Sequence, residues 1–174
     1  MPRKNIFIRH YQTPAGEMVL GSYDDQLCLC DWFKEKRRFR IGYRIEKLFN
    51  AKLINESSEV TDKAIAELDE YFSRKRTSFD IPLIFAGTDF QKRVWNKLLE
   101  IPYGHTMSYG AMARLLDFPQ AVRAVANANG ANAISIFVPC HRIIGSNHKL
   151  VGYAGGLDAK KKLLNLECGE TELF

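Results

Sequence analysis

The sequence predicts a chain in two parts, an α/β domain at residues 1–80 and a mainly α domain with a helix-turn-helix at residues 88–174. Short stretches of β-forming residues bounded by turn residues fill most of the first part, and segments with helical apolar spacing dominate the second. The chain has 174 residues, 46% of them hydrophobic, which suits one or two domains with real cores.

Turn residues separate the strand candidates of the first part. Pro14-Ala15-Gly16 separates the first two strands, and Asp24-Asp25 separates the second from the third. Apolar residues spaced four apart, from Val60 to Phe72, indicate a helix. The predicted strands are 4–11, 16–23, 26–33 and 51–55, and the predicted helices are 39–49 and 60–73.

The second part begins with a helix start signal. Thr88 and Gln91 have the spacing of a capping box, and the helix that follows is expected to stop at Pro102. Ser108 can cap a second helix, and Pro119 is expected in the first turn of a third.

The second and third helices of this part are expected to form a helix-turn-helix. Asp117-Phe118 is the predicted tight turn between them, and Asn129-Gly130 is expected to end the third helix. This pattern alone is weak evidence for DNA binding. A last helix is expected at residues 157–166.

The overall charge favours a polyanionic partner, since the net charge is +5 and the pI is about 9.0. The densest basic run, from Lys34 to Arg44, is interpreted as a solvated loop and helix face. The chain has no apolar stretch long enough to cross a bilayer and no signal-peptide apolar region at its start. We therefore expect a cytoplasmic protein, or a nuclear one in a eukaryote.

The four cysteines are Cys28, Cys30, Cys140 and Cys168, and they form neither a CxxC pair nor a disulfide framework. Cys28 and Cys30 alternate along a strand and could join His10 in part of a metal site. The spacing is not that of a zinc finger, so packing is the favoured interpretation and no metal is expected.

A thiol lies directly beside an imidazole in Val138-Pro139-Cys140-His141-Arg142. A cysteine attacks as the thiolate, and a neighbouring base promotes that form, so Cys140 and His141 are a candidate nucleophile and activator. Successive side chains of a strand point to opposite faces, so the pair can cooperate only if the chain bends, which Pro139 makes plausible. A buried structural cysteine beside a surface histidine is an equally good interpretation of this segment alone.

The third helix of the second part has many small side chains and one arginine, Arg123. A helix that reads base edges would carry several long polar side chains, so this one can read little sequence. Small side chains permit close approach to a narrow groove, with one long side chain as a wedge. On the helix alone, an alanine-rich packing helix with an exposed arginine is the better interpretation.

The segments of the second part, in this order, resemble the O6-alkylguanine–DNA alkyltransferase family. The similarity runs from about residue 88 to residue 167 and is highly specific. The matching segments are Thr88-Asp-Phe-Gln-Lys-Arg-Val-Trp95, Ile101-Pro-Tyr-Gly-His-Thr-Met-Ser-Tyr-Gly110, Ala121-Val-Arg-Ala-Val125, Val138-Pro-Cys-His-Arg142, Gly152-Tyr-Ala-Gly-Gly-Leu157 and Leu163-Leu-Asn-Leu-Glu167.

The resemblance implies a ribonuclease-H-like first domain and a winged-helix-like second domain. Two departures are visible. This chain has Asn132-Ala133 where the family usually has Asn-Pro, which leaves the turn less pre-set. The zinc ligands that some relatives carry cannot be assembled here. A non-enzymatic branch of the family replaces the cysteine, and Cys140 argues against membership of that branch.

The activity implied by the resemblance is direct, single-turnover repair of DNA without a cofactor. An alkyl group on O6 of guanine, and as a further candidate on O4 of thymine, would pass irreversibly to Cys140. His141 would accept the thiol proton through water, Glu167 would hold the imidazole, and Asn132 would fix the turn beside the pocket. Tyr109 would donate a hydrogen bond to the leaving guanine. The residues expected to line the substrate pocket are Val138, Pro139, Tyr153, Ala154, Gly155 and Gly156.

The partner implied by the resemblance is double-stranded DNA, bound by a monomer through the minor groove with little sequence preference. A damaged base inside a duplex must be flipped out, and Arg123 would fill the space it leaves. The other residues expected to contact DNA are Ser108, Tyr109, Ala121 and Ala124.

Three alternative functions remain open at this point. A lesion-binding module of the same fold would flip the base without removing the alkyl group. A cysteine hydrolase would turn over and ignore DNA. A helix-turn-helix regulator would bind a specific sequence, which the small side chains around Arg123 argue against.

Overall fold

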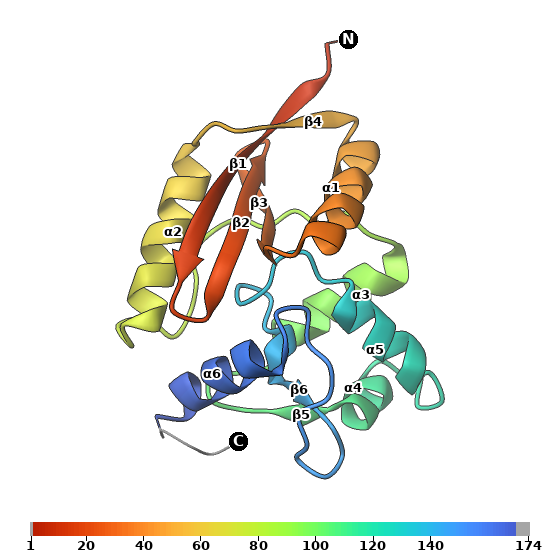
Figure 1. Cartoon of the computed structure of the whole chain (residues 1–174). Coiled ribbons are helices and arrows are strands. Elements are labelled where there is room, and N and C mark those ends of the chain that lie inside the picture. The colour runs from red at the N-terminus through yellow and green to blue at the C-terminus, as the bar shows by residue number, and fades with distance from the viewer. Residues whose placement is uncertain (1, 170–174) are drawn as a thin grey trace. The chain divides into compact units, whose positions relative to one another are not determined.

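The computed structural model describes residues 2–169 and divides the chain into two compact units, Met1–Gly87 and Thr88–Phe174 (Figure 1). Within residues 2–169, every helix is too short or too polar to cross a membrane.

The first unit contains a four-stranded sheet in the order β3-β2-β1-β4. The strands β1, β2 and β3 form an antiparallel meander, and β4 pairs with β1 in parallel. All four predicted strands are confirmed, and β1 is two residues longer than predicted. Their bounds are β1 Lys4–Thr13, β2 Gly16–Tyr23, β3 Gln26–Trp32 and β4 Ala51–Ile54.

Two helices, α1 (Glu35–Phe49) and α2 (Glu59–Phe72), lie on either side of these strands in the view of Figure 1. The predicted start of α1 at residue 39 was wrong by four residues. Lys34 occupies the N-cap without a side-chain hydrogen bond, so the sequence has no capping signal there. The start of α2 has one, because the hydroxyl of Ser58 accepts a hydrogen bond from the backbone N–H of Thr61.

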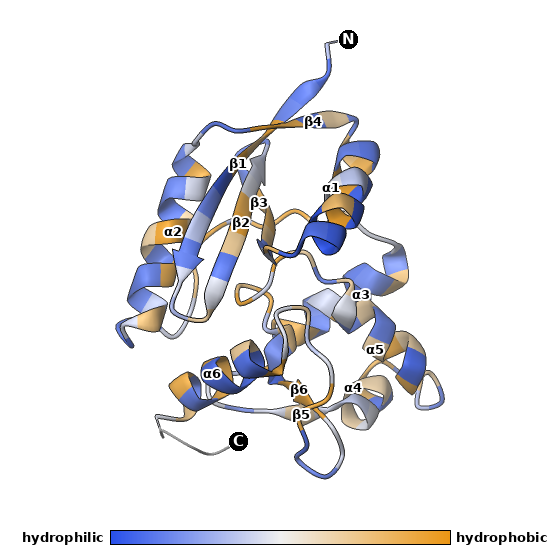
Figure 2. Cartoon of the chain, viewed as in Figure 1, coloured by the Kyte–Doolittle hydropathy of each residue, from blue (hydrophilic) through white to orange (hydrophobic). Residues whose placement is uncertain are grey.

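Apolar side chains of the central strands and of both helices make the core of the first unit (Figure 2). Cys28 and Cys30 are buried in it, as packing residues would be. His10 lies on β1, where its imidazole contacts the carboxylate of Glu17 at 3.0 Å. No group of three or more His, Cys, Asp or Glu residues that could hold a metal ion occurs within the described part of the chain.

The second unit is mainly helical. The capping box of Thr88 and Gln91 is confirmed, and so is Ser108 as a cap, since its hydroxyl accepts from the N–H of Ala111. The two short strands and the 3-10 helix were not predicted, because elements of two or three residues have no periodic signal. The elements are α3 Asp89–Leu98, β5 Met107–Ser108, α4 Tyr109–Leu115, α5 Val122–Gly130, η1 Cys140–Arg142, β6 Ile143–Ile144 and α6 Leu157–Cys168.

The connection between α4 and α5 differs from the predicted tight turn. Pro119 lies in this connection and not in the first turn of α5, because α5 begins only after an N-cap at Ala121. The backbone N–H of Ala121 donates to the carbonyl of Phe118, which makes an additional turn ahead of the helix. The predicted end of α5 at Gly130 is confirmed.

A buried tryptophan joins α3 to α5. The indole N–H of Trp95 on α3 donates to the carbonyl oxygen of Ala128 on α5 at 2.8 Å. Trp95 and Ala128 are both buried, so this bond is protected from water. The bond holds α5, and residues of α5 form one wall of a cavity in this unit.

Candidate active site

A cavity of about 590 Å³ in the second unit contains the candidate nucleophile in its wall. Side chains and backbone from α4, α5, η1 and the loop before α6 enclose it. Its lining residues are Tyr109, Val122, Arg123, Ala126, Asn127, Asn129, Gly130, Cys140, Val151, Gly152, Tyr153 and Ala154. The lining is mostly apolar with a few polar groups, as in sites for small organic molecules.

The bend that the Cys140–His141 pair requires is present. Pro139 precedes η1, and Cys140 and His141 are the first two residues of this 3-10 helix. Successive side chains of a 3-10 helix are about a third of a turn apart, so neighbours need not face opposite ways as they would in a strand. Cys140 is 3% exposed and His141 is fully buried, which excludes the interpretation of a surface histidine.

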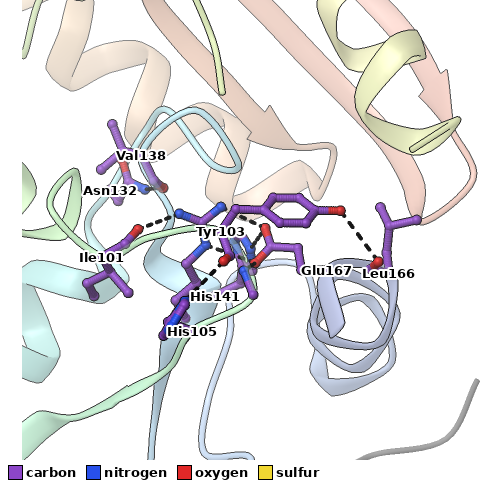
Figure 3. Close-up of polar contacts among 10 residues, drawn as sticks. Ile101, Tyr103, His105, Asn132, Val138, His141, Leu166 and Glu167 are labelled. Atoms are coloured by element: carbon purple, nitrogen blue, oxygen red, sulfur yellow. Dashed lines mark hydrogen bonds and ion pairs between the residues drawn. The ribbon is translucent and has the colours of Figure 1, made fainter. Parts of the chain in front are cut away.

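His141 and Glu167 face each other in the interior (Figure 3). Nε2 of His141 lies 2.7 Å from a carboxylate oxygen of Glu167 on α6. An ionised carboxylate only accepts, so Nε2 is the donor in this contact, and Nδ1 is the basic nitrogen whenever the imidazole is neutral. Nδ1 is buried and has no hydrogen-bond partner within residues 2–169. A basic nitrogen without a hydrogen-bond partner, on the residue that follows the cysteine, is available as a proton acceptor.

Arg142, for which the sequence predicts no role, holds the same carboxylate. Its guanidinium donates to both oxygens of Glu167, each at 2.9 Å, and to the carbonyl of Ile101 at 2.6 Å. Burial alone would raise the pKa of Glu167, but the charge and hydrogen bonds of His141 and Arg142 outweigh burial and hold that pKa well below its usual range. Glu167 therefore remains ionised at neutral pH.

Asn132 fixes the turn that leads into η1. Its amide N–H donates to the carbonyl of Val138 at 3.0 Å (Figure 3). Its amide oxygen accepts from the N–H of Ile134 at 2.9 Å. The side chain thus joins both ends of the turn, although Ala133 stands in place of a proline. Inside the turn, Ile136 has a φ of 73°, a strained conformation for a β-branched residue.

Tyr109 and Asn129 are two of the polar residues that line the cavity. The hydroxyl of Tyr109 donates to the carbonyl of Val151 at 3.4 Å, and the amide of Asn129 donates to the carbonyl of Cys140 at 3.4 Å. Burial, and then the charge of Cys140, raise the pKa of Tyr109 above its ordinary value. Tyr109 therefore keeps its proton and can act as a donor.

Lys160 is a second residue without a role in the sequence analysis. It lies on α6, is fully buried, and its ammonium donates to the carbonyls of Ile143, Val151 and Gly152 at 2.5, 3.3 and 3.3 Å. Burial lowers its pKa to about 8, against the opposing effect of Cys140. Through this ammonium, α6 is joined both to β6 and to the loop that lines the cavity.

The structure brings together most of the residues expected in the site. Cys140, Tyr109, Arg123, Tyr153 and Ala154 line the cavity, and Arg123 is exposed. Four residues expected in the pocket do not line it. They belong to the backbone that leads into η1 or into α6, and they are Val138, Pro139, Gly155 and Gly156. The remaining expected DNA contacts cap or begin helices beside the cavity, with Ser108 before α4 and Ala121 and Ala124 at the start of α5.

This chain is similar in sequence and in fold to known methyltransferases. Residues 89–169 match the family described as 6-O-methylguanine DNA methyltransferase, DNA binding domain. A methylated-DNA–protein-cysteine methyltransferase of Methanosarcina acetivorans is 42% identical over 157 residues, which cover 90% of this chain and 95% of the relative. The protein of the same name from Mycobacterium leprae is 52% identical over 165 residues, covering 93% of this chain and 92% of the relative.

The fold comparison extends over both units. The crystal structure of Mycobacterium tuberculosis OGT in complex with DNA has a TM-score of 0.79 with this chain at 37% identity, covering 94% of this chain and 93% of the other. The chain belongs to the methylated-DNA–protein-cysteine methyltransferase family.

The ion cluster around Glu167 predicts a large stability effect. Glu167→Gln leaves the buried guanidinium of Arg142 without its counter-charge, so the free energy of unfolding should fall by about 3 kcal/mol or more at pH 7. The lowered pKa of Glu167 means that this contribution is present above about pH 4.5 and is lost as the pH falls further. Urea unfolding of wild type and variant at several pH values should show their difference shrinking below about pH 4.5.

The matched control for this prediction is Glu100→Gln. Glu100 pairs with Lys97 in the same unit, but its side chain is 66% exposed. Its removal should cost less than about 1 kcal/mol, with little change with pH. A Glu167→Gln variant as stable as Glu100→Gln would contradict the role given to the buried cluster.

The contacts of Lys160 predict a local and pH-dependent effect. Lys160→Met keeps the aliphatic volume but leaves three carbonyls without this donor, so amides of residues 145–152 should exchange about tenfold faster with solvent. The exposed neighbour Lys161→Met is the control and should change nothing. Hydrogen exchange followed by mass spectrometry measures both variants.

The sign of the pH dependence follows from the pKa of Lys160. Because the folded pKa of about 8 lies below the unfolded value near 10.5, the unfolded chain binds more protons between these values. Wild type should therefore gain stability relative to Lys160→Met as the pH rises from about 8 to about 10. A difference that stays constant over this window would show that Lys160 is not buried as a cation.

Proposed function

We propose that the protein repairs alkylated DNA by transferring an alkyl group from O6 of guanine to Cys140 in one irreversible turnover. The observation that carries this proposal is the thiol in the cavity wall, with the basic Nδ1 of its neighbour His141 oriented by Glu167. The family membership supports the same activity, that of a methylated-DNA–[protein]-cysteine S-methyltransferase. An alkyl group on O4 of thymine is a second candidate substrate.

The reaction is a displacement at a saturated carbon. The thiol proton of Cys140 passes to Nδ1 of His141 through a water molecule, and the sulfur lone pair forms a C–S bond as the C–O bond breaks. The electron pair of the broken bond remains on guanine, where Tyr109 donates to the ring and stabilises the developing charge. No cofactor is required. The thioether has no route back to a thiol, so each molecule acts once.

The DNA contacts are assigned to the two helices at the mouth of the cavity. Arg123 is exposed on α5 at the cavity rim, where it can replace a base that has been flipped out of the duplex. Ala121 and Ala124 allow the start of α5 to approach the minor groove closely, and Ser108 and Tyr109 begin α4 beside it. We assign binding to a monomer with little sequence preference, because the small side chains of α5 can read few base edges.

We assign a fold to each of the two units. We assign a ribonuclease-H-like fold to the first unit, which has a mixed sheet with helices packed on it. We assign a winged-helix-like fold to the second, in which α4 and α5 form the helix-turn-helix and the short strands β5 and β6 pair beside them. Both the DNA contacts and the acceptor thiol belong to the second unit.

The acceptor is tested by Cys140→Ala. This variant should gain no mass from a duplex containing O6-methylguanine, whereas wild type should gain one methyl group per molecule, as measured by intact-mass spectrometry. Duplex binding should persist, because the DNA contacts lie on α4 and α5. Methyl uptake by the variant would identify another thiol as the acceptor, with Cys168 as the first candidate since Cys28 and Cys30 are buried. Duplex binding without methyl uptake by wild type would instead indicate a lesion-binding module.

The role of Arg123 is tested by comparing two substrates. Arg123→Ala should slow single-turnover repair of a duplex lesion by at least tenfold but leave the reaction with free O6-benzylguanine nearly unchanged, because a free base needs no flipping. Arg123→Lys should restore repair only in part, since lysine lacks the planar guanidinium. Equal losses on both substrates would place Arg123 in the pocket or the fold. Full rescue by lysine, with a defect that follows salt, would indicate a charge-only role.

A further inference from the structure

The outer face of α1 in the first unit carries cations and aromatic rings in alternation. Its members are separated by three, four, seven and eleven residues from the first, so they lie on one face of the helix. All are exposed, Phe39 at 80% and Tyr43 at 60%. This α1 stripe consists of Lys36, Phe39, Arg40, Tyr43 and Lys47.

The side chains of the stripe take little part in the packing of the first unit, because they are exposed. The opposite face of α1 is anchored by the buried residues Ile41 and Ile45. Within residues 2–169, the side chains of the three stripe cations make no hydrogen bond or ion pair, and the two rings make no ring contact. By contrast Arg37, on the inner side of the same helix, is bound to Asp31 at 2.8 Å.

A hollow of about 400 Å³ lies against the aromatic part of the stripe. Phe39 and Tyr43 form one of its sides, and Gly42 and Leu53 are among the residues that line it. Phe39 and Tyr43 are four positions apart in the helix, so their backbone positions differ by about 6 Å along its axis. Two planar groups can therefore stack on them separately, with room beside the rings for an adjoining group.

We propose that the α1 stripe binds single-stranded nucleic acid, with phosphates on Lys36, Arg40 and Lys47 and bases stacked on Phe39 and Tyr43. Grooves that bind single strands combine these two features, because cations follow the backbone and every base offers a face for stacking. The charge complementarity favours this occupant. The three stripe cations, together with Arg38 in the lining of the hollow, outnumber the two carboxylates of α1, Glu35 and Glu46. Both carboxylates line the hollow, so phosphates are expected on the outer cations and not inside it.

Other occupants fit the stripe less well. A membrane surface would require an apolar face free to enter lipid, but the apolar face of α1 is buried against the first unit. An acidic peptide would use the cations without any need for two exposed planar rings. The inference does not depend on the alkyl transfer assigned to the second unit, because no residue of the stripe belongs to that unit.

The test measures the anisotropy of a fluorescent oligothymidylate of about twelve nucleotides, within the usual site sizes for single strands. All proteins carry Arg123→Ala to weaken DNA binding by the second unit. Phe39→Ala/Tyr43→Ala should weaken binding about tenfold or more, given the typical loss per stacked base. Phe39→Leu/Tyr43→Leu keeps apolar area but removes the planar rings, so it should weaken binding similarly.

The cations are tested through salt dependence. The slope of log affinity against log salt is negative. Lys36→Gln/Arg40→Gln should reduce its magnitude by about 1.4, which corresponds to the loss of two phosphate contacts. The matched control, Lys52→Gln/Lys75→Gln, removes two exposed charges from the first unit outside α1 and should leave the slope within about 0.5 of the parent. All substituted side chains are exposed, so thermal melting should confirm unchanged folds.

Three results would overturn the proposal. Unchanged affinity in the alanine double variant would remove the rings from the site. Full binding by the leucine variant would show general apolar contact in place of base stacking. Binding of polyglutamate that is stronger than binding of oligothymidylate and is lost with the stripe would identify an acidic protein partner. Losses in both aromatic variants and in the charge variant, with the control unaffected, would support single-strand binding.

Discussion

The carboxylate of Glu167 is the interaction on which the rest of the second unit's site depends. It accepts from Nε2 of His141 on one side and from Nε and Nη2 of Arg142 on the other, and Nη1 of Arg142 donates to the carbonyl of Ile101. One buried charge therefore joins α6, η1 and the segment after α3. A buried carboxylate is tolerable only with such partners, since removal from water costs several kcal/mol for each unpaired ion. The same pairing that satisfies the charge also sets the tautomer of His141, so stability and chemistry rest on the same atoms.

The parts of this arrangement with local signals could be predicted from the sequence. Capping residues such as Thr88 and Ser108 identify helix starts, and the strands of the first unit follow from turn residues and β-forming stretches. The pairing of Cys140 with His141 is visible because the two are adjacent. The partnership of Glu167 with His141 spans 26 residues and came only through the family resemblance. Neither Arg142 nor Lys160 could be given a role from sequence, because a basic residue in a polar context is usually exposed and only the tertiary fold buries these two.

The two faces that bear cations differ in a way that composition cannot reveal. The basic run of α1 reads as one solvated cluster in the sequence, yet Arg37 is held by Asp31 while Lys36 and Arg40 project outward beside two exposed rings. On α5, by contrast, Arg123 is the long cation among small side chains at a cavity rim. A single long cation beside a cavity suits insertion of that side chain into a DNA duplex. A stripe of alternating cations and rings suits a flexible single strand of nucleic acid. Charge sign alone would assign both surfaces to the same ligand.

The turn ahead of Cys140 has a fixed geometry although no proline stiffens it. With alanine at position 133, the backbone torsion is not locked as proline would lock it. Asn132 compensates by bonding Ile134 and Val138, the two ends of the turn. Between them, the N–H of Phe137 donates to the carbonyl of Ser135 at 2.9 Å across Ile136, whose positive φ is costly for a branched side chain. Such a conformation persists only where its surroundings dictate it. The asparagine and the burial of the whole segment supply that constraint, and they place the thiol at the cavity wall rather than inside a strand.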